Sequence, residues 1–475
     1  VRNSAAVRTD GSSVVYWMIA QRRTSFNFAL QRAADWARYL GRPLLIFEPL
    51  RSDYPWASVR LHRFIIDGMA ANLEALDGMN VTYYPYVEPE PGHGRGLLPA
   101  VAEGACLVVT DHFPTSFLPR MVDAAAEKLD VKLEAVDSNG LIPLASSDRE
   151  FPTAYSYRRF LQRHFVDHLQ DLPLEKPLFD LPTAVAVPAR ITDRWPAASP
   201  DLLLGKPNAL SRLPIDQSVP AAPSRGGAAE GCTVLCDFLG AKLDRYTEVR
   251  NRPDDDATSG LSPYLHFGHL SPHQVFLEVA TRERWSPEQV VPPANGRRAG
   301  WWGMSESAEA FLDQFITWRE LGFHFCHHRE DHGRYESLPG WAQETLAKHA
   351  VDTRDHVYTI DQFDSAATHD PLWNAAQNQL RREGRLHNYL RMLWGKKILE
   401  WSFEPREALD IMIELNNRYA LDGRDPNSYS GIFWVLGRHD RAWGPERPVF
   451  GTVRYMSSAN TARKVPVKRY LEVYS

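Results

Sequence analysis

Residues 14–50 read VVYWMIAQRRTSFNFALQRAADWARYLGRPLLIFEPL, and their pattern decides the fold. The run VVYWM (Val14–Met18) is short and apolar throughout, which is typical of a strand buried on both faces. Residues 27–40 then place apolar side chains at helical spacing, and Gly41 stands where a glycine commonly ends a helix. A second strand-like run, PLLIFEPL, follows directly. A strand, a helix and a strand in this order predict a parallel βαβ unit.

The same alternation continues along the first part of the chain. Helical spacing recurs in residues 58–76, 98–103 and 117–129, and the strand-like runs VTYYPY, CLVVTD and VKLEAV alternate with them. This pattern predicts a doubly wound parallel sheet in an α/β domain. No GxGxxG motif follows the first run, so the sequence does not support a nicotinamide-type dinucleotide site.

The composition changes in the middle of the chain. Residues 171–231 are rich in Pro, Ala and Ser, as a connector between domains often is. From residue 232 to the end, the pattern is helical and aromatic. We therefore predict an α/β domain over residues 12–170, a long interdomain linker over 171–231 and an all-α domain over 232–475. Two domains suit a chain of 475 residues.

Charge and cysteine content narrow the class of protein. The formal net charge is −5, which argues against a surface coated with Lys and Arg but allows a local basic groove. No apolar run is long enough for a membrane span. Four cysteines are too few for a disulfide framework and suit a reducing interior, so we expect a cytoplasmic protein. Cys232 and Cys236 have no partner pair at zinc spacing, which favours two buried thiols on a helix over a metal site.

A small, hydroxyl-rich turn precedes one of the predicted helices. It consists of Thr258, Ser259, Gly260, Leu261 and Ser262. Backbone N–H groups at the start of a helix, together with Ser and Thr hydroxyls, can bind a phosphate. The same residues also form an ordinary helix-capping sequence, so both interpretations stay open.

Aromatic residues with helical spacing mark a second group of candidates. Trp394 and Trp401 are seven residues apart, and two helical turns, a rise of roughly 10.5 Å, place both indoles on one face. Trp373 belongs to the preceding helix. Three such tryptophans form either part of the core or a relay of oxidisable rings. Nearby, Asp422 could pair with Arg391, and burying that ion pair would be costly unless a ligand or network uses it.

Several segments together resemble the photolyase and cryptochrome family, and class II cyclobutane pyrimidine dimer photolyases in particular. The segments, in chain order, are TSGLSPYLHFGHLSPHQ, THDPLWNAAQ, RMLWGKKILEW and LDGRDPNSYSGIFW. The resemblance covers nearly the whole chain. It implies an N-terminal domain that can hold an antenna chromophore of deazaflavin or folate type, and a helical domain that holds non-covalent FAD. It further implies light-driven repair of ultraviolet-damaged DNA by electron transfer to a flipped-out dimer, and a monomeric enzyme.

The resemblance also implies roles for individual residues. The residues that would bind FAD are Tyr246, Thr258, Ser259, Gly260, Leu261, Ser262, Arg319, Asn388, Arg391 and Asp422. The electron relay would run through Trp394, Trp373 and Trp401, and Asn416 would lie near flavin N5. Trp318 and Trp434 would form the aromatic walls of the dimer pocket. No metal ligand is implied.

One position departs from the family pattern. Class II enzymes usually carry a carboxylate one helical turn before the position of Trp318, and this chain has Gln314. Gln has two donors and one acceptor, but it cannot give a proton. Two alternatives follow: a cryptochrome-like flavin photoreceptor with little repair, and a (6-4) photolyase. The second would need a histidine acid, for which the candidates are His266, His269 and His387.

Overall fold

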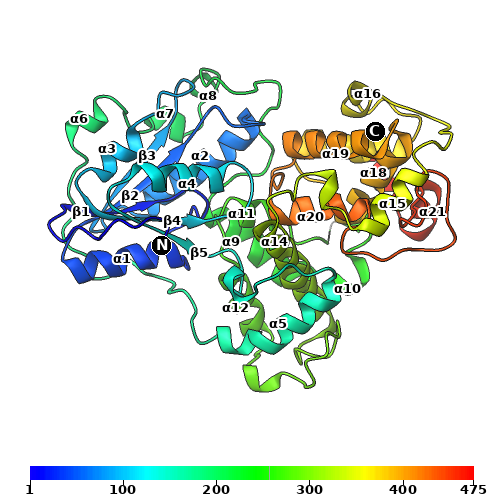
Figure 1. The fold of residues 1–475 in the computed structure, drawn as a ribbon, viewed down its shortest axis with the longest axis horizontal. Helices are drawn as coiled ribbons and strands as arrows, with labels where there is room; N and C mark the ends of the chain where they lie inside the picture. The colour runs from blue at the N-terminus through cyan, green and yellow to red at the C-terminus, as the bar shows by residue number, and fades with distance from the viewer. Residues whose placement is uncertain (256) are drawn as a thin grey trace. The chain divides into compact units, whose positions relative to one another are not determined.

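The computed structural model describes residues 1–255 and 257–475, which form two compact units (Figure 1). The first unit contains Val1–Leu144, Asp167–Leu235 and Leu261–Glu278. The second contains Ala145–Val166, Cys236–Gly260 and Val279–Ser475.

A five-stranded parallel sheet is the centre of the first unit. Its strands are β1 (Ser13–Trp17), β2 (Leu44–Leu50), β3 (Val81–Val87), β4 (Ala105–His112) and β5 (Lys132–Asp137). Their order in the sheet is β3-β2-β1-β4-β5, and every neighbouring pair is parallel. All residues of β1 are buried, and because successive side chains point to opposite faces, both faces of the sheet are covered there. The predicted doubly wound sheet is confirmed.

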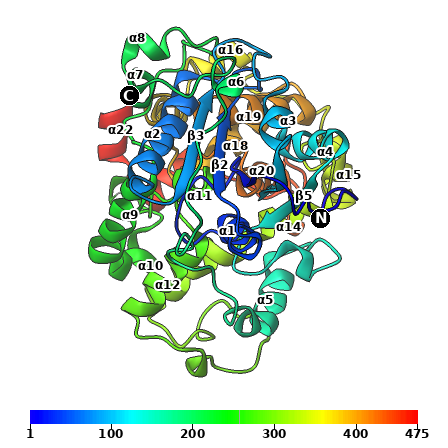
Figure 2. The same cartoon turned by 90° about the vertical axis from the view of Figure 1, so that its left-hand side faces the viewer.

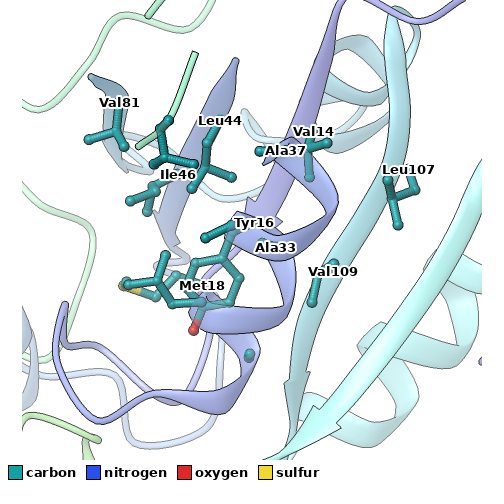
Figure 3. Close-up of a cluster of buried hydrophobic side chains, with 14 of the residues drawn as sticks. Val14, Tyr16, Met18, Ala33, Ala37, Leu44, Ile46, Val81, Leu107 and Val109 are labelled. Atoms are coloured by element: carbon teal, nitrogen blue, oxygen red, sulfur yellow. The ribbon is translucent and has the colours of Figure 1, made fainter. Parts of the chain in front are cut away.

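In the first unit, helices alternate with the strands, and several short helices follow the last strand. They are α1 (Phe28–Leu40), α2 (Val59–Ala75), α3 (Leu97–Ala102), α4 (Leu118–Lys128), α6 (Ala189–Thr192), α7 (Pro200–Leu203), α8 (Pro207–Leu210) and α11 (Ser262–His266). The helix α1 ends at Gly41, whose φ of +64° is the left-handed conformation that glycine adopts readily. Figure 3 shows Ala33 and Ala37 of α1 among side chains of the sheet such as Val14 and Leu107.

The second unit is built from helices. They are α5 (Ala154–His168), α10 (Tyr246–Val249), α13 (Glu306–Leu312), α14 (Arg319–His328), α15 (Gly340–Lys348), α16 (Ile360–Asp364), α17 (Pro371–Glu383), α18 (Asn388–Trp401), α19 (Pro405–Tyr419), α20 (Pro426–Val435), α21 (Ser458–Lys464) and α22 (Lys468–Tyr474). Two more, α9 (Ala228–Asp237) and α12 (Pro272–Arg282), run across a boundary between the units. Within the second unit, α18 packs against α17, α19 and α20. Figure 2 shows α18 beside α19 and α20.

The limits of the two units differ from the predicted domains. Residues 171–231 belong to the first unit, where the Trp195 indole N–H donates to the His93 carbonyl at 2.8 Å. The helix α5 belongs to the second unit, and its Phe165 ring lies 4.8 Å from the Trp302 ring. A composition rich in Pro, Ala and Ser disfavours long helices and strands, but it does not show whether the segment packs on a neighbouring sheet.

A buried carboxylate holds the loop that follows β1. Asp111 lies near the carboxyl end of β4 and is fully buried. One of its oxygens accepts the backbone N–H groups of Ile19, Ala20 and Gln21 at 2.8–2.9 Å, and the other accepts the Tyr16 hydroxyl at 2.7 Å. These four bonds compensate a charge that would otherwise be costly to bury. They fix the loop at the point where the strand order reverses, between β1 and β4.

We expect Asp111→Ala to destabilise the first unit by about 3–5 kcal/mol, because three buried N–H groups would lose their acceptor. Hydrogen exchange of the β1 and β4 amides measures this locally, as a protein with two units need not unfold in one transition. Asp77→Ala removes an exposed carboxylate of the same unit and should change stability by less than about 0.5 kcal/mol. Wild-type protection in Asp111→Ala would contradict the assignment.

Candidate active site

An ion pair joins α18 to the loop that precedes α20. The Nη2 atom of Arg391 lies 3.0 and 3.2 Å from the two carboxylate oxygens of Asp422. The two side chains remain 19% and 15% exposed. The structure thus contains the Arg391–Asp422 ion pair that the sequence suggested. Because the pair is only half-buried, a bound molecule can still reach its charged groups.

Asn416 of α19 ties this ion pair to α20. Its Oδ1 accepts from Arg391 Nη1 at 3.3 Å, and its Nδ2 donates to Ser428 at 2.8 Å and to Asn417 at 3.1 Å. An amide NH₂ group has two protons, and both are used here. In this geometry Asn416 holds the Arg391 guanidinium in place and has no further N–H to offer to a ligand.

The other predicted flavin residues lie on separate elements. Asn388, one turn before Arg391 on α18, is exposed. Arg319 is buried on α14, with its guanidinium 4.4 Å from the Phe323 ring centre. Tyr246 begins α10, where burial raises the pKa of its phenol and keeps it neutral.

The predicted phosphate turn has the expected local structure. Gly260 has φ +69°, a conformation that residues with a side chain rarely adopt, and Ser262 is the first residue of α11. The N-cap residue of α11 is Leu261, whose side chain has no atom that can accept a hydrogen bond from the start of the helix. Thr258, Ser259 and Gly260 belong to the second unit and Leu261 and Ser262 to the first, so phosphate binding stays a prediction.

Two tryptophans of the second unit meet at its surface. The ring centres of Trp318 and Trp434 lie 5.5 Å apart, and the ring planes are inclined by 49°. Both side chains are half-buried. Gln314, four residues before Trp318, is also half-buried, whereas every other residue of 311–320 is buried. The two indoles therefore form an inclined, half-buried pair, and Gln314 lies on the same side of its helix as Trp318.

A π-helical turn, Asp313–Trp318, produces this arrangement between α13 and α14. Asp313 points inward, where its carboxylate binds Arg158 Nε at 2.8 Å and Nη2 at 2.7 Å. The adjacent Gln314 faces outward, as expected for neighbours on a helix. Such turns often occur at functional sites. Nothing in the residue types of this segment signals the π-helical turn.

The surroundings of Trp434 include groups that the sequence did not indicate. The Arg454 guanidinium lies 5.5 Å from the Trp434 ring and 4.2 Å from the Trp443 ring, and it pairs with Asp440 at 3.0 Å. Behind them, Lys396 donates to the Val435 carbonyl, and burial lowers the pKa of this lysine to about 7. No spacing rule connects these residues, which come from different elements.

The three tryptophans of the predicted relay are buried and adjacent. Trp394 and Trp401 lie on α18, and Trp373 lies on α17. The Trp373 indole N–H donates to the Trp394 carbonyl at 3.0 Å, and the Trp373 and Trp401 ring centres are 6.1 Å apart. The Trp394 indole N–H donates to Gln377 Oε1 at 2.9 Å. In the order Trp394, Trp373, Trp401, each residue is therefore in contact with the next.

Other sequence expectations concern metals, thiols and membranes. Cys232 is half-buried and Cys236 is exposed on α9, so the prediction of two buried thiols was wrong: α9 turns this face outward. Within the described residues, no group of His, Cys, Asp and Glu side chains is arranged to hold a metal ion. No described helix combines the length and apolar character needed to cross a bilayer.

Solved structures with the same fold include a class III photolyase from Agrobacterium tumefaciens and a cryptochrome from Synechocystis sp. The first has a TM-score of 0.72 at 17% identity, with 99% of this chain and 87% of that chain covered. The second has a TM-score of 0.66 at 15% identity, with 98% and 88% covered. At such identities, these structures support the fold alone.

Sequence comparison gives the family. No family model matches the chain. Three proteins named deoxyribodipyrimidine photo-lyase are similar to it: from Methanothermobacter thermautotrophicus (34% identity, 99% of this chain and 97% of the relative), Arabidopsis thaliana (33%, 96% and 88%) and Potorous tridactylus (32%, 98% and 81%). The identity is 32–34% over at least 96% of this chain and at least 81% of each relative, so the chain belongs to the deoxyribodipyrimidine photo-lyase family of enzymes.

Proposed function

We propose that this enzyme splits cyclobutane pyrimidine dimers in ultraviolet-damaged DNA, using light and a non-covalent FAD. The observation that carries the proposal is the half-buried, inclined pair of Trp318 and Trp434 in the unit that also contains the three buried tryptophans of the proposed relay. The names of the relatives, deoxyribodipyrimidine photo-lyases, agree with it.

The inclination of the two indoles suits the lesion. A dimer within a duplex is out of reach, so the enzyme must flip it out, at a cost of a few kcal/mol that is smallest for a damaged site. Two cross-linking bonds incline the two bases of the dimer toward each other, and two indoles inclined by 49° can each support one base. Stacking of this kind contributes about 1–3 kcal/mol per base.

The residues around Arg391 fit a flavin. When bound, FAD supplies the light absorption and the electron that opens the cyclobutane ring. Arg391 and Asp422 would flank it, Asn416 would keep the guanidinium in place, and Asn388 would offer an exposed amide. Tyr246, Arg319 and the turn of residues 258–262 complete the proposed binding set.

We infer that Trp394, Trp373 and Trp401 carry electrons from the surface toward the cofactor. The indole N–H groups of Trp394 and Trp373 both donate to amide carbonyl oxygens. These oxygens are poor bases, so an oxidised Trp394 or Trp373 would keep its proton and could recover an electron from the next ring. The inner hydrogen bonds thus favour movement of the positive charge outward.

The (6-4) alternative finds little support in the histidines. Nδ1 of His269 accepts the Gly227 N–H at 2.9 Å, and burial lowers the pKa of this imidazole to about 3, so it would not be an acid at neutral pH. Among the described residues, no histidine ring contacts Trp318 or Trp434. A flavin photoreceptor is the second candidate function, and Gln314 in place of a carboxylate is the observation that favours it.

For the first unit we propose, from the family and the fold, an antenna chromophore of deazaflavin or folate type. The carboxyl ends of β1 and β4, where the strand order reverses, are where sheets of this kind bind ligands. Near the lesion pocket, Arg454 and Arg441 are the cations proposed to meet DNA phosphates. Arg382 donates to the carbonyl oxygens of Val473 and Ser475, so it is used to hold the C-terminal helix α22.

Asp422→Ala should weaken FAD binding about 10- to 100-fold, because Arg391 would lose its counter-charge and its orientation. The dissociation constant, measured by equilibrium dialysis of FAD against the apoprotein, tests this. Asp410→Ala removes an exposed carboxylate from α19 and is the matched control. Equal FAD affinity of both variants would show that the ion pair lies away from the flavin.

Trp394→Phe should slow photoreduction of the flavin, because the first donor of the relay is lost. Dimer repair by the chemically reduced variant should persist, since the relay only prepares the cofactor. Steady-state photoreduction under blue light and repair after dithionite treatment are the two measurements. Photoreduction at the wild-type rate would mean that another donor is used.

Gln314→Glu should raise the repair yield per absorbed photon. A protonated carboxyl can donate to the carbonyl oxygen on which negative charge develops, and a contact of this kind contributes about 1–2 kcal/mol. The assay compares fully reduced wild type and variant on the same thymine-dimer oligonucleotide at equal absorbed light. Gln170→Glu, at an exposed position, is the control. If neither wild type nor Gln314→Glu repairs the dimer while both bind and photoreduce FAD, the photoreceptor replaces our proposal.

A further inference from the structure

The helix α20, which carries Trp434, ends in a turn that the chain itself closes. Gly437 has φ +109°, in the region of positive φ that favours glycine. Its N–H donates to the Trp434 carbonyl at 3.1 Å, and the N–H of Arg438 donates to the Phe433 carbonyl at 3.0 Å. These two bonds form a Schellman motif, which satisfies carbonyl groups that the end of a helix leaves free. The carbonyl of Val435 is not part of this motif.

A lysine from another helix supplies the bond for that carbonyl. Nζ of Lys396, on α18, donates to the Val435 carbonyl oxygen. Lys396 is only 1% exposed. A basic group at the last turn of a helix is stabilising, because the carbonyl groups there carry partial negative charge. The helix α18 thus caps α20 at the residue next to Trp434.

The two helices approach each other closely at this point. Gly395 precedes Lys396 on α18, and a Cβ atom at Gly395 would lie 2.6 Å from Cγ2 of Val435 and 3.1 Å from Sδ of Met412. The first distance is too short for a residue with a side chain. The glycine therefore lets α18 lie against the end of α20 and brings the Lys396 amine within reach of the Val435 oxygen.

The same turn leads to a group that lies over the Trp434 ring. Asp440 comes three residues after Gly437, and its carboxylate accepts from Arg454 Nε at 3.0 Å. The Arg454 guanidinium lies 5.5 Å from the Trp434 ring centre. Both the main chain of Trp434 and the cation beside its ring are therefore held by the segment that Lys396 caps.

We propose that Lys396 is a positioning residue of the lesion pocket and fixes the angle at which Trp434 meets a flipped-out dimer. This inference rests on the proposed function, in which Trp434 stacks on the lesion. Val435 is buried, so its carbonyl would lose its partner without the lysine, and the last turn of α20 would shift to find another. The inclination of 49° between Trp434 and Trp318 would then no longer be fixed.

The titration of Lys396 suits a fixed support. Burial lowers the pKa of this lysine to about 7, Arg454 lowers it further, and Asp440 acts in the opposite direction. Above pH 7, most of the amines are therefore uncharged, which reduces the cost of burying them. A neutral amine still has N–H groups to donate, so the bond to Val435 can form on both sides of this pKa.

The test is a double-mutant cycle on the FAD-loaded full-length protein. The probes are a duplex oligonucleotide with one thymine dimer and the same duplex without damage. Lys396→Met keeps a long side chain and removes the donor, so the dissociation constant for the dimer duplex should rise about 10-fold, with no change for the undamaged duplex. Trp434→Ala should weaken dimer binding at least as much. Adding Lys396→Met to Trp434→Ala should cause no further loss, because the lysine acts through that indole.

The neighbouring lysine provides a matched control. Lys397 is also buried on α18, but its ammonium pairs with Glu400 and lies 5.3 Å from the Trp401 ring centre. Adjacent side chains of a helix point in different directions, so Lys397→Met should bind the dimer duplex as wild type does. The FAD content and the flavin photoreduction of Lys396→Met, measured on the same samples, should also equal those of wild type.

The outcomes separate this inference from the proposed function. If wild type binds the two duplexes equally, both fail. If wild type prefers the dimer and Lys396→Met prefers it to the same degree, only the inference fails. Loss of FAD from Lys396→Met would show that the lysine supports the whole unit rather than the pocket. Additive effects in the cycle would show that it acts other than through Trp434, and either of these results would overturn the proposal.

Discussion

The ion pair between Arg391 and Asp422 is the contact on which the proposed site depends. It joins α18, which carries Trp394 and Trp401, to the loop that leads into α20, which carries Trp434. Through Asn416 it also reaches α19. Under the proposed function, the guanidinium of Arg391 would therefore set the position of the cofactor, of the inner end of the relay and of one wall of the lesion pocket. A half-buried pair of this kind is stabilised mainly by its network, because the two charges alone recover little more than their desolvation costs.

The hydrogen bonds of the aromatic rings change character from the inside outward. Trp394 and Trp373 donate to neutral amide oxygens. Next to Trp401, by contrast, the hydroxyl of Tyr358 lies 2.7 Å from Nδ1 of His369. The basicity of the atom to which an aromatic ring is hydrogen-bonded decides whether the ring keeps its proton when it is oxidised. Under the proposed function, an oxidised Trp394 or Trp373 would keep its proton, and the positive charge could move on to the next ring.

The sequence predicted the features that depend on local pattern. The strands agree with prediction to within about a residue, because buried parallel strands are short continuous apolar runs. The Arg391–Asp422 pair was also anticipated. The family resemblance, rather than spacing, indicated which tryptophans to examine. The packing of residues 171–231, the Arg454 contacts and the Tyr358–His369 pair were missed, because each joins segments that no periodicity relates.

The π-helical turn at Asp313–Trp318 has a consequence for how the family can vary in length. Relative to a regular α-helix, such a turn accommodates an extra residue, so deleting one residue would allow α13 and α14 to continue as a single straight helix. The side chains of α13 and α14 would keep their directions about the axis, because the deletion removes only the residue that the wider turn accommodates. The change would be confined to the turn itself, which carries Gln314. The length of the chain can therefore vary by one residue within this buried segment, and not only in the loops on either side.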